Sequence, residues 1–207
     1  MEKKILVVFM SCKKNNNLWK KILNVDINSI IFYGNPEINE PFTYNNRILT
    51  LKCNDTYDFL PVKVYLMVKS ILEIPEFSDI THILKIDDWD TKIDNDIDNK
   101  IKGLDLSDYC GQKLNNQYVG DRRWHFNKCP IDSIWNNKEY DGKYIPWIDG
   151  GCGYILSRNA MNLISNTNMS ESEICNNFIY EDLMISLMLH SNNIFPQEIR
   201  QVITGDK

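Results

Sequence analysis

Three carboxylates follow directly on an apolar segment of the chain. Residues 82–86 read His-Ile-Leu-Lys-Ile, which is typical of a buried strand, and Asp87, Asp88 and Asp90 come next. Carboxylates packed this closely repel one another unless a cation or solvent offsets their charge. Mg²⁺ and Mn²⁺ prefer such oxygen ligands, and ligands of open α/β sheets bind beyond the carboxyl ends of the strands. The pattern therefore predicts a divalent-metal site, and its alternative is a solvated acidic turn.

A second pair of acids, Glu181 and Asp182, opens an apolar helical pattern late in the chain. A carboxylate in such a position can take the proton of a hydroxyl group as a bond forms to its oxygen. Acidic residues in the first turn also stabilise a helix through its dipole, without any chemistry. The residues alone support both interpretations.

Residues 150–153 read Gly-Gly-Cys-Gly. Glycine has no Cβ and tolerates positive φ, so the backbone at Gly150 and Gly151 can pass close to a ligand. The spacing fits neither a Walker nor a Rossmann fingerprint. A tight turn before the next strand is the alternative.

Acids also alternate at Asp94, Asp96 and Asp98, as they do in an EF-hand loop. The sixth position of that loop is Asn99 instead of glycine, and the twelfth is Asp105 instead of glutamate. A calcium-stabilised interaction module is therefore a weaker hypothesis than a metal site at the end of the strand.

The elements that would position these residues alternate between strands and helices. We predict strands at residues 5–10, 30–33, 47–51, 82–86 and 154–156, and helices at residues 18–23, 59–74, 158–164 and 181–190. Pro61 suits the first turn of the second helix, Pro75 ends it, and Ser157 is the N-cap of the third. Residues 94–144 are polar, aromatic and poorly periodic, as in a long excursion that faces a substrate. This order indicates one α/β domain, residues 1–207, with a mostly parallel central sheet flanked by helices.

Composition excludes several classes of protein. The net charge of -5 over 207 residues argues against a nucleic-acid binder, which needs a basic face for phosphates. None of the six cysteines forms a Cys-x-x-Cys pair, so we expect mostly free thiols in a reducing compartment. No segment approaches the roughly 18 apolar residues of a membrane span, and residues 5–10 are better interpreted as a strand than as a signal peptide.

Four segments, in this order, resemble the inverting beta-1,3-galactosyltransferase family and its fringe relatives. Residues 55–63 (Asp-Thr-Tyr-Asp-Phe-Leu-Pro-Val-Lys) are similar to the family's Asp-Ser-Tyr-x-Asn-Leu-Thr-x-Lys, and residues 85–88 (Lys-Ile-Asp-Asp) to its Lys-Thr-Asp-Asp-Asp. Residues 144–158 are similar to its Tyr-Pro-Pro-Tyr, Gly-Gly-x-Gly-Tyr and Leu-Ser-Arg run, and residues 181–183 (Glu-Asp-Leu) to its Glu-Asp-Val.

The resemblance implies a GT-A fold and transfer of a hexose or N-acetylhexosamine from a UDP-sugar to a hydroxyl of a glycan or glycoconjugate, with inversion at the anomeric carbon. It implies Asp182 as the catalytic base, with Glu181 as the second choice, and Mn²⁺ or Mg²⁺ held by Asp88 and Asp90. Trp147 and Trp89 suit stacking on sugar rings, although a core position is the commoner fate of a tryptophan. The residues expected to bind the donor are Phe9, Ser11, Lys63, Asp87, Asp88, Gly150 and Gly151.

The chain departs from this family at two points. Trp89 stands where the family has its third aspartate, which leaves Asp88 and Asp90 as alternative main ligands. In addition, no histidine follows residues 181–183 at the distance of the family's metal-binding histidine. These departures motivate a second hypothesis, a catalytically degenerate protein that binds a sugar nucleotide or a glycan. Because neither signal peptide nor anchor is seen, a soluble cytoplasmic enzyme, or one encoded by a virus, is expected.

Overall fold

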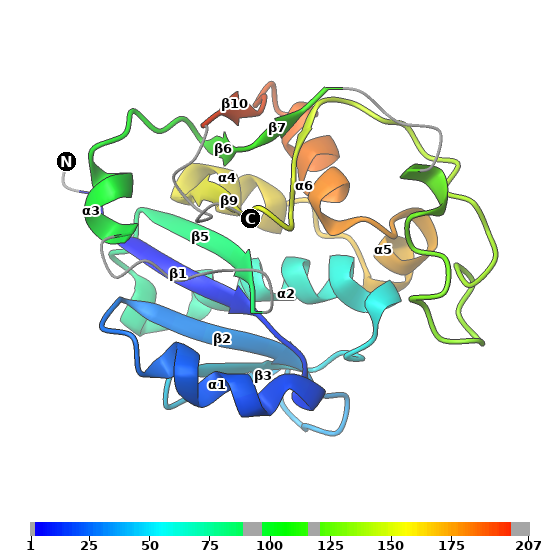
Figure 1. Cartoon of the computed structure of the whole chain (residues 1–207), viewed down its shortest axis with the longest axis horizontal. Helices are drawn as coiled ribbons and strands as arrows, with labels where there is room; N and C mark the ends of the chain where they lie inside the picture. Colours follow the sequence, from blue (N-terminus) through cyan, green and yellow to red (C-terminus); the bar gives the residue numbers. More distant parts are fainter. Residues whose placement is uncertain (1–2, 89–96, 116–120, 200–207) are drawn as a thin grey trace.

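The computed structural model describes residues 3–88, 97–115 and 121–199 of the chain. In this part of the chain, eight strands form one sheet in the order β10-β6-β9-β5-β1-β2-β4-β3, with helices on both of its faces (Figure 1). The predicted α/β class, with a mostly parallel central sheet flanked by helices, is confirmed. The strands of this sheet are β1 (Ile5–Met10), β2 (Ser29–Gly34), β3 (Phe42–Asn45), β4 (Ile48–Leu51), β5 (His82–Asp87), β6 (Tyr109–Gly111), β9 (Tyr154–Ser157) and β10 (Gln197–Glu198).

β1 lies in the middle of the sheet and brings the candidate residues of two strands together. It pairs in parallel with β2 on one side and β5 on the other, and all of it is buried, as its unbroken apolar sequence predicts. Side chains alternate between the two faces of a strand, so Phe9 packs into one core and Met10 into the other. The register places Met10 opposite Asp87, at the carboxyl ends of β1 and β5.

Two cores of unequal size cover the faces of the sheet. The smaller core includes Ile22 of α1 and Ile101 of α3, whereas the larger core is covered by the four remaining helices. The predicted N-cap is confirmed, because the Ser157 hydroxyl accepts a hydrogen bond from the Ala160 N–H at 3.1 Å. The helices are α1 (Asn16–Leu23), α2 (Leu60–Glu73), α3 (Ile97–Lys102), α4 (Arg158–Ser165), α5 (Glu171–Asn177) and α6 (Glu181–His190), and short 3-10 turns lie at η1 (Lys13–Asn15), η2 (Tyr57–Phe59), η3 (Pro75–Phe77) and η4 (Asp121–Arg123).

Several elements lie outside the predicted set, among them β3 and α5. β3 forms an antiparallel hairpin with β4, and its turn contains Asn46 and Arg47 at φ values of 50° and 63°. α5 begins with a capping box in which Ser170 and Glu173 satisfy each other's backbone N–H groups. The stretch predicted as an excursion, residues 94–144, also contains α3 and β6.

The segment between β7 (Lys113–Leu114) and β8 (Trp147–Ile148) carries a small core of its own, which we call the excursion core. Its buried members are Trp135, Tyr140, Ile145, Trp147, Ile179 and Leu183. Because Leu183 belongs to α6, this segment packs against the start of that helix, and Figure 1 shows it beside α5 and α6.

Two predictions from composition can be compared with the structure. All six cysteines are free thiols, as expected from their spacing. Among the described residues, no helix combines the length and the apolar character that crossing a membrane requires.

Candidate functional site

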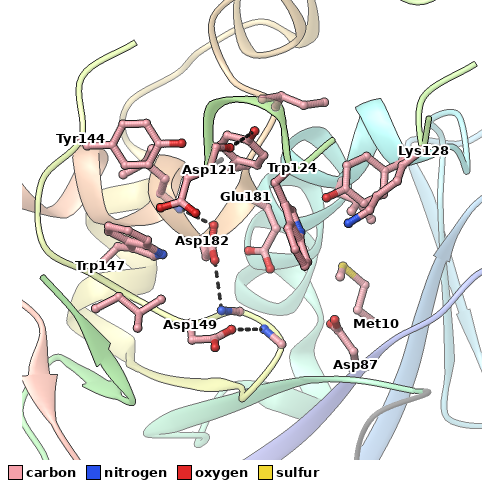
Figure 2. Close-up of a pocket in the computed structure, with 18 residues that line it drawn as sticks. Met10, Asp87, Asp121, Trp124, Lys128, Tyr144, Trp147, Asp149, Glu181 and Asp182 are labelled. Atoms are coloured by element: carbon pink, nitrogen blue, oxygen red, sulfur yellow. Dashed lines mark hydrogen bonds between the residues drawn. The ribbon is translucent and has the colours of Figure 1, made fainter. Parts of the chain in front are cut away.

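A cavity of about 590 Å³ opens where β1 and β5 end (Figure 2). Met10 and Asp87, the last residues of these strands, line it. Gly150 and Gly151 line it from the turn before β9, and the first residues of α6 complete this side. The location agrees with the rule that ligands of α/β sheets bind beyond the carboxyl ends of the strands.

The cavity is strongly acidic. Among the described residues that line it, Lys128 is the one lysine or arginine. An anionic ligand would therefore be repelled unless a cation accompanied it or lay close by. The acidic residues of the lining are Asp87, Asp121, Asp149, Glu181 and Asp182.

Lys85 joins three parts of this site and has no exposed surface. Its Nζ lies 2.6 Å from Glu181 Oε1 and 2.7 Å from Asp87 Oδ1, and it donates to the Gly150 carbonyl at 3.3 Å. Burial lowers the pKa of Lys85, but the two carboxylates outweigh it and hold that pKa above its ordinary value. Lys85 is therefore a charged ammonium, and its burial is possible because it is paired.

Glu181 is buried and has both carboxylate oxygens engaged. Lys85 contacts Oε1, and the Tyr154 hydroxyl donates to Oε2 at 2.8 Å. The cation comes from β5 and the hydroxyl from β9, two neighbouring antiparallel strands. The sheet itself therefore fixes the position of this side chain.

Asp182 lies beside Glu181 and has different partners. The Gly150 N–H donates to its Oδ2 at 3.1 Å, and the Leu183 N–H donates to its Oδ1 at 2.7 Å. Burial, and then the charge of the neighbouring Glu181 carboxylate, raise the pKa of Asp182 to about 7, and the hydrogen bond from the Gly150 N–H opposes the rise. A carboxyl group that titrates near neutral pH, at the wall of a cavity, is a candidate acid or base.

The glycine at position 150 is required by a close approach. A Cβ on Gly150 would lie 2.6 Å from Glu181 Oε1, which is closer than such atoms pack, and 3.2 Å from the Asp182 Cβ, which is a tight contact. The next glycine, Gly151, donates its N–H to Asp149 Oδ1 at 2.9 Å. The glycine run is therefore a turn that lets the backbone meet two carboxylates.

The two adjacent acids at the end of β5 have different surroundings. Asp87 lines the cavity. Asp88 instead accepts hydrogen bonds from the Ser11 hydroxyl and from the Asn15 amide, the latter at 3.2 Å. Burial raises the pKa of Asp88, and the hydrogen bonds from Ser11 and Asn15 oppose that rise. Asp90, the other expected metal ligand, lies outside the described residues.

Lys63, one of the residues expected to bind the donor, is buried beside an acid. Its Nζ lies 2.5 Å from Asp55 Oδ1 and donates to the Ser11 carbonyl at 3.1 Å. Asp55 also accepts the Gly34 N–H at 3.1 Å. Lys63 thus ties together the ends of β1 and β2, and its charge is balanced by Asp55.

Some of the predicted site residues lie at the cavity, and the others lie away from it. Those at the cavity are Asp87, Gly150, Gly151, Glu181 and Asp182. Phe9 packs in the smaller core, whereas Ser11, Lys63 and Asp88 form a hydrogen-bonded cluster at the end of β1.

Aromatic side chains form the rim of the cavity. Trp124, 66% exposed, lies under the Lys128 ammonium, which is 3.8 Å from its ring centroid. Figure 2 shows Trp124 between Lys128 and Glu181. Trp147 and Tyr144 also line the cavity, with ring centroids 5.5 Å apart. The exposed face of Trp124 suits the C–H surface of a sugar ring, whereas Trp147 is 8% exposed and packs in the excursion core.

Several lining residues were outside the sequence prediction. Tyr144 and Asp149 fall within the segment that resembles the transferase family, and a search for acids and aromatics next to the glycine run would have found them. Asp121 and Trp124 come from the excursion, where no periodic pattern marks them.

The described residues alone do not form a metal site. No group of three or more His, Cys, Asp or Glu side chains among them is arranged to hold a metal ion. The alternating acids Asp94 and Asp96 lie outside the described residues, as does the side chain of Asp98. Neither the manganese site nor the calcium loop is therefore tested by this geometry.

No protein-family model matches the chain, and no curated protein matches it either.

Proposed function

We propose that this protein is an inverting glycosyltransferase with a GT-A-like domain. It would move a hexose or N-acetylhexosamine from a UDP-sugar to a hydroxyl of a glycan or glycoconjugate. The observation that carries the proposal is Asp182, a carboxyl group with a pKa of about 7, in an acidic, aromatic-rimmed cavity at the carboxyl ends of β1 and β5. The motif resemblance supports the same reaction, since it points to Asp182 as the base.

In the proposed reaction, the Asp182 carboxylate takes the proton of the acceptor hydroxyl. The acceptor oxygen forms its bond to the anomeric carbon while the bond to the diphosphate breaks, and UDP leaves with that electron pair. A pKa near 7 keeps a useful fraction of Asp182 ionised at neutral pH and makes it a stronger base than an ordinary carboxylate. The exposed ring of Trp124 would hold a sugar ring by stacking.

A divalent ion would supply charge compensation for the diphosphate. Mn²⁺ or Mg²⁺ at Asp88 and Asp90 is the proposed cofactor, and it would offset the charge that develops on UDP. The acidity of the cavity favours such an ion, because a diphosphate would otherwise face five acidic residues.

The test is thermal stabilisation by UDP, other nucleotides and UDP-sugars, each with and without Mn²⁺. A metal-dependent rise in Tm with a UDP-sugar, lost in the Asp88→Ala, Asp90→Ala double variant, is expected. Asp182→Asn is the matched control, because it should bind donor and fail to transfer. A folded protein that no nucleotide stabilises would refute the proposal.

A specific observation favours a second candidate, a degenerate protein that binds a sugar nucleotide or glycan without turnover. The Asp88 carboxylate is already engaged by Ser11 and Asn15, which reduces its capacity for a metal. Under this alternative, donors stabilise the protein equally with and without Mn²⁺. Neither sugar transfer nor hydrolysis of the donor is then detected.

A further inference from the structure

One cation at the cavity carries no compensating acid. Lys128 is the lysine of the described lining. Burial lowers its pKa, and the Cys129 thiol is the one ionisable group among the described residues that opposes this effect. By contrast, the buried ammonium groups of Lys85 and Lys63 each lie against at least one carboxylate. The charge of Lys128 is therefore available to an anionic ligand in the cavity.

Two aromatic rings hold the Lys128 ammonium in place. Nζ lies 3.8 Å from the centroid of the Trp124 ring and 5.4 Å from that of the Tyr57 ring. An aromatic face attracts a cation without cancelling its charge, because the ring is neutral. Burial, and then the charge of Asp182, raise the pKa of Tyr57, and Asp87 also contributes. Tyr57 therefore lies near both the ammonium and the carboxyl end of β5.

The turn that carries Lys128 is fixed to the start of α6. Asn127, directly before it, has a φ of 65°, in the left-handed region that asparagine tolerates better than most side chains do. The Lys128 N–H donates to the His125 carbonyl at 3.1 Å. His125 Nδ1 in turn lies 2.7 Å from the hydroxyl of Tyr180, which is the N-cap residue of α6. The backbone at Lys128 is thus held at a fixed position relative to the acids of that helix.

We propose that Lys128 binds the diphosphate of the sugar nucleotide and stabilises the negative charge that UDP gains as it leaves. This inference rests on the proposed function and adds a residue to its reaction. Figure 2 shows Lys128 on the same side of the cavity as Met10 and Asp87, with Tyr144 and Trp147 on the opposite side. A diphosphate bound beyond the carboxyl end of β5 lies on the Lys128 side, and the acceptor then lies toward Tyr144.

The chemistry assigns the ammonium to the leaving group. When the bond between the anomeric carbon and the diphosphate oxygen breaks, its electron pair stays on that oxygen. The Lys128 ammonium donates a hydrogen bond to a phosphate oxygen and keeps its proton, while the proton of the acceptor goes to Asp182. Hydrogen bonds between charged groups are the strong ones, and this one strengthens as negative charge develops on UDP. Lys128 therefore offsets part of the repulsion that the acidic lining exerts on the donor.

Isothermal titration calorimetry with uridine, UMP, UDP and inorganic pyrophosphate, each with Mg²⁺, tests the proposal on the full chain. Lys128→Met keeps an apolar stem and removes the charge. It should weaken the binding of UDP and of pyrophosphate roughly tenfold and leave the binding of uridine unchanged. Lys128→Arg, which restores a cation, should recover most of the affinity for UDP. If Lys128→Met binds UDP as tightly as the wild type does, the proposal is wrong.

Lys138→Met is the matched control. Lys138 belongs to the same segment, and its Nζ lies 4.7 Å from the centroid of the Trp135 ring, but it is outside the described lining of the cavity. This variant removes the same net charge and the same kind of contact, so UDP should bind it as it binds the wild type. An equal loss of UDP affinity in Lys138→Met would show that net charge, and not contact with the diphosphate, decides the effect, and would overturn the proposal.

The outcomes separate this inference from the proposed function. If pyrophosphate binding depends on Lys128 while no UDP-sugar reacts, the diphosphate site stands and the transferase proposal fails. If UDP-sugars react equally well in the wild type and in Lys128→Met, the transferase proposal holds and the role of Lys128 is refuted. If neither UDP nor pyrophosphate binds the folded wild type, Lys128 has no diphosphate to bind and the inference fails.

Discussion

Asp182→Asn is expected to reverse its effect on stability between acidic and alkaline pH. Burial, and then the charge of Glu181, raise the pKa of Asp182 from 3.8 to about 7. The folded protein therefore holds this proton more tightly than the unfolded chain does. Below about pH 4 the carboxyl is protonated in both states, and as the pH rises through 7 the folded state loses the stability linked to that proton.

The size of this loss follows from the two pKa values. A rise from 3.8 to about 7, at about 1.36 kcal/mol for each pKa unit, gives about 4 kcal/mol between pH 4 and pH 8. Asparagine does not titrate and escapes this loss. Its amide NH₂ group, however, opposes one of the two backbone N–H donors at the site, which costs about 1–3 kcal/mol at every pH. The variant should therefore be less stable than the wild type at pH 4 and more stable at pH 8.

Urea unfolding at intervals from pH 4 to pH 8 measures this difference. Glu173→Gln is the matched control with the opposite sign, because hydrogen bonds from Ser170 lower the pKa of Glu173. The ionised Glu173 carboxylate stabilises the fold above its unfolded pKa, and this contribution is lost as the pH falls. The free energy of unfolding of Glu173→Gln should therefore approach that of the wild type at acidic pH. If the free-energy difference between Asp182→Asn and the wild type stays constant from pH 4 to pH 8, burial does not shift Asp182 and the reasoning is wrong.

Three further predictions concern the stability of two variants and the pH dependence of sugar transfer. Gly150→Ala should lower the free energy of unfolding by about 1–3 kcal/mol, because the new Cβ would lie 2.6 Å from a carboxylate oxygen. In the control Gly103→Ala, the nearest atoms to the new Cβ are 3.7 Å away, so this variant should keep the stability of the wild type. Urea unfolding compares the two variants. Lys63→Met should cost about 3–5 kcal/mol, because it leaves Asp55 unpaired, and adding Asp55→Asn should recover part of the loss in the same assay. If Asp182 is the base, kcat/KM for sugar transfer should rise with pH through about 7 and level off above it; a profile that is flat from pH 5 to 9 contradicts that role.

The sequence identified the part of the site that depends on strand and helix ends. The unbroken apolar run of β1 and the acids after β5 place Asp87 at the carboxyl edge of a buried sheet. The start of α6 marks Glu181 and Asp182, and the glycine run marks the turn that meets them. These residues lie in one cavity. The strand, helix and glycine patterns place them at the carboxyl edge of the sheet, which is also where ligands of α/β proteins bind.

Other residues of the site depend on contacts that no local pattern encodes. From the sequence, Lys63 is expected to bind the donor. In the fold, α2 packs on the sheet, and Lys63 is buried against Asp55, which lies eight residues earlier in the chain. Asp87, the last residue of β5, lines the cavity, whereas Asp88, just after the strand, accepts hydrogen bonds from Ser11 and Asn15. The motif gives no indication of which of the two lies at the cavity. Trp124 lies at the rim of the cavity in the same segment as Trp135 and Tyr140 of the excursion core, and the aromatic residues of this segment have no regular spacing.

The excursion core has a consequence for how this protein can diversify. Residues such as Trp135 and Tyr140 anchor the rim-bearing segment through their own contacts with the start of α6, while the strands that carry Asp87 and Lys85 are held by separate cores. The rim is therefore a module. Its outward residues can change, by mutation or by exchange of the whole segment between β7 and β8, and alter what the cavity admits while the sheet that holds the acids keeps its packing.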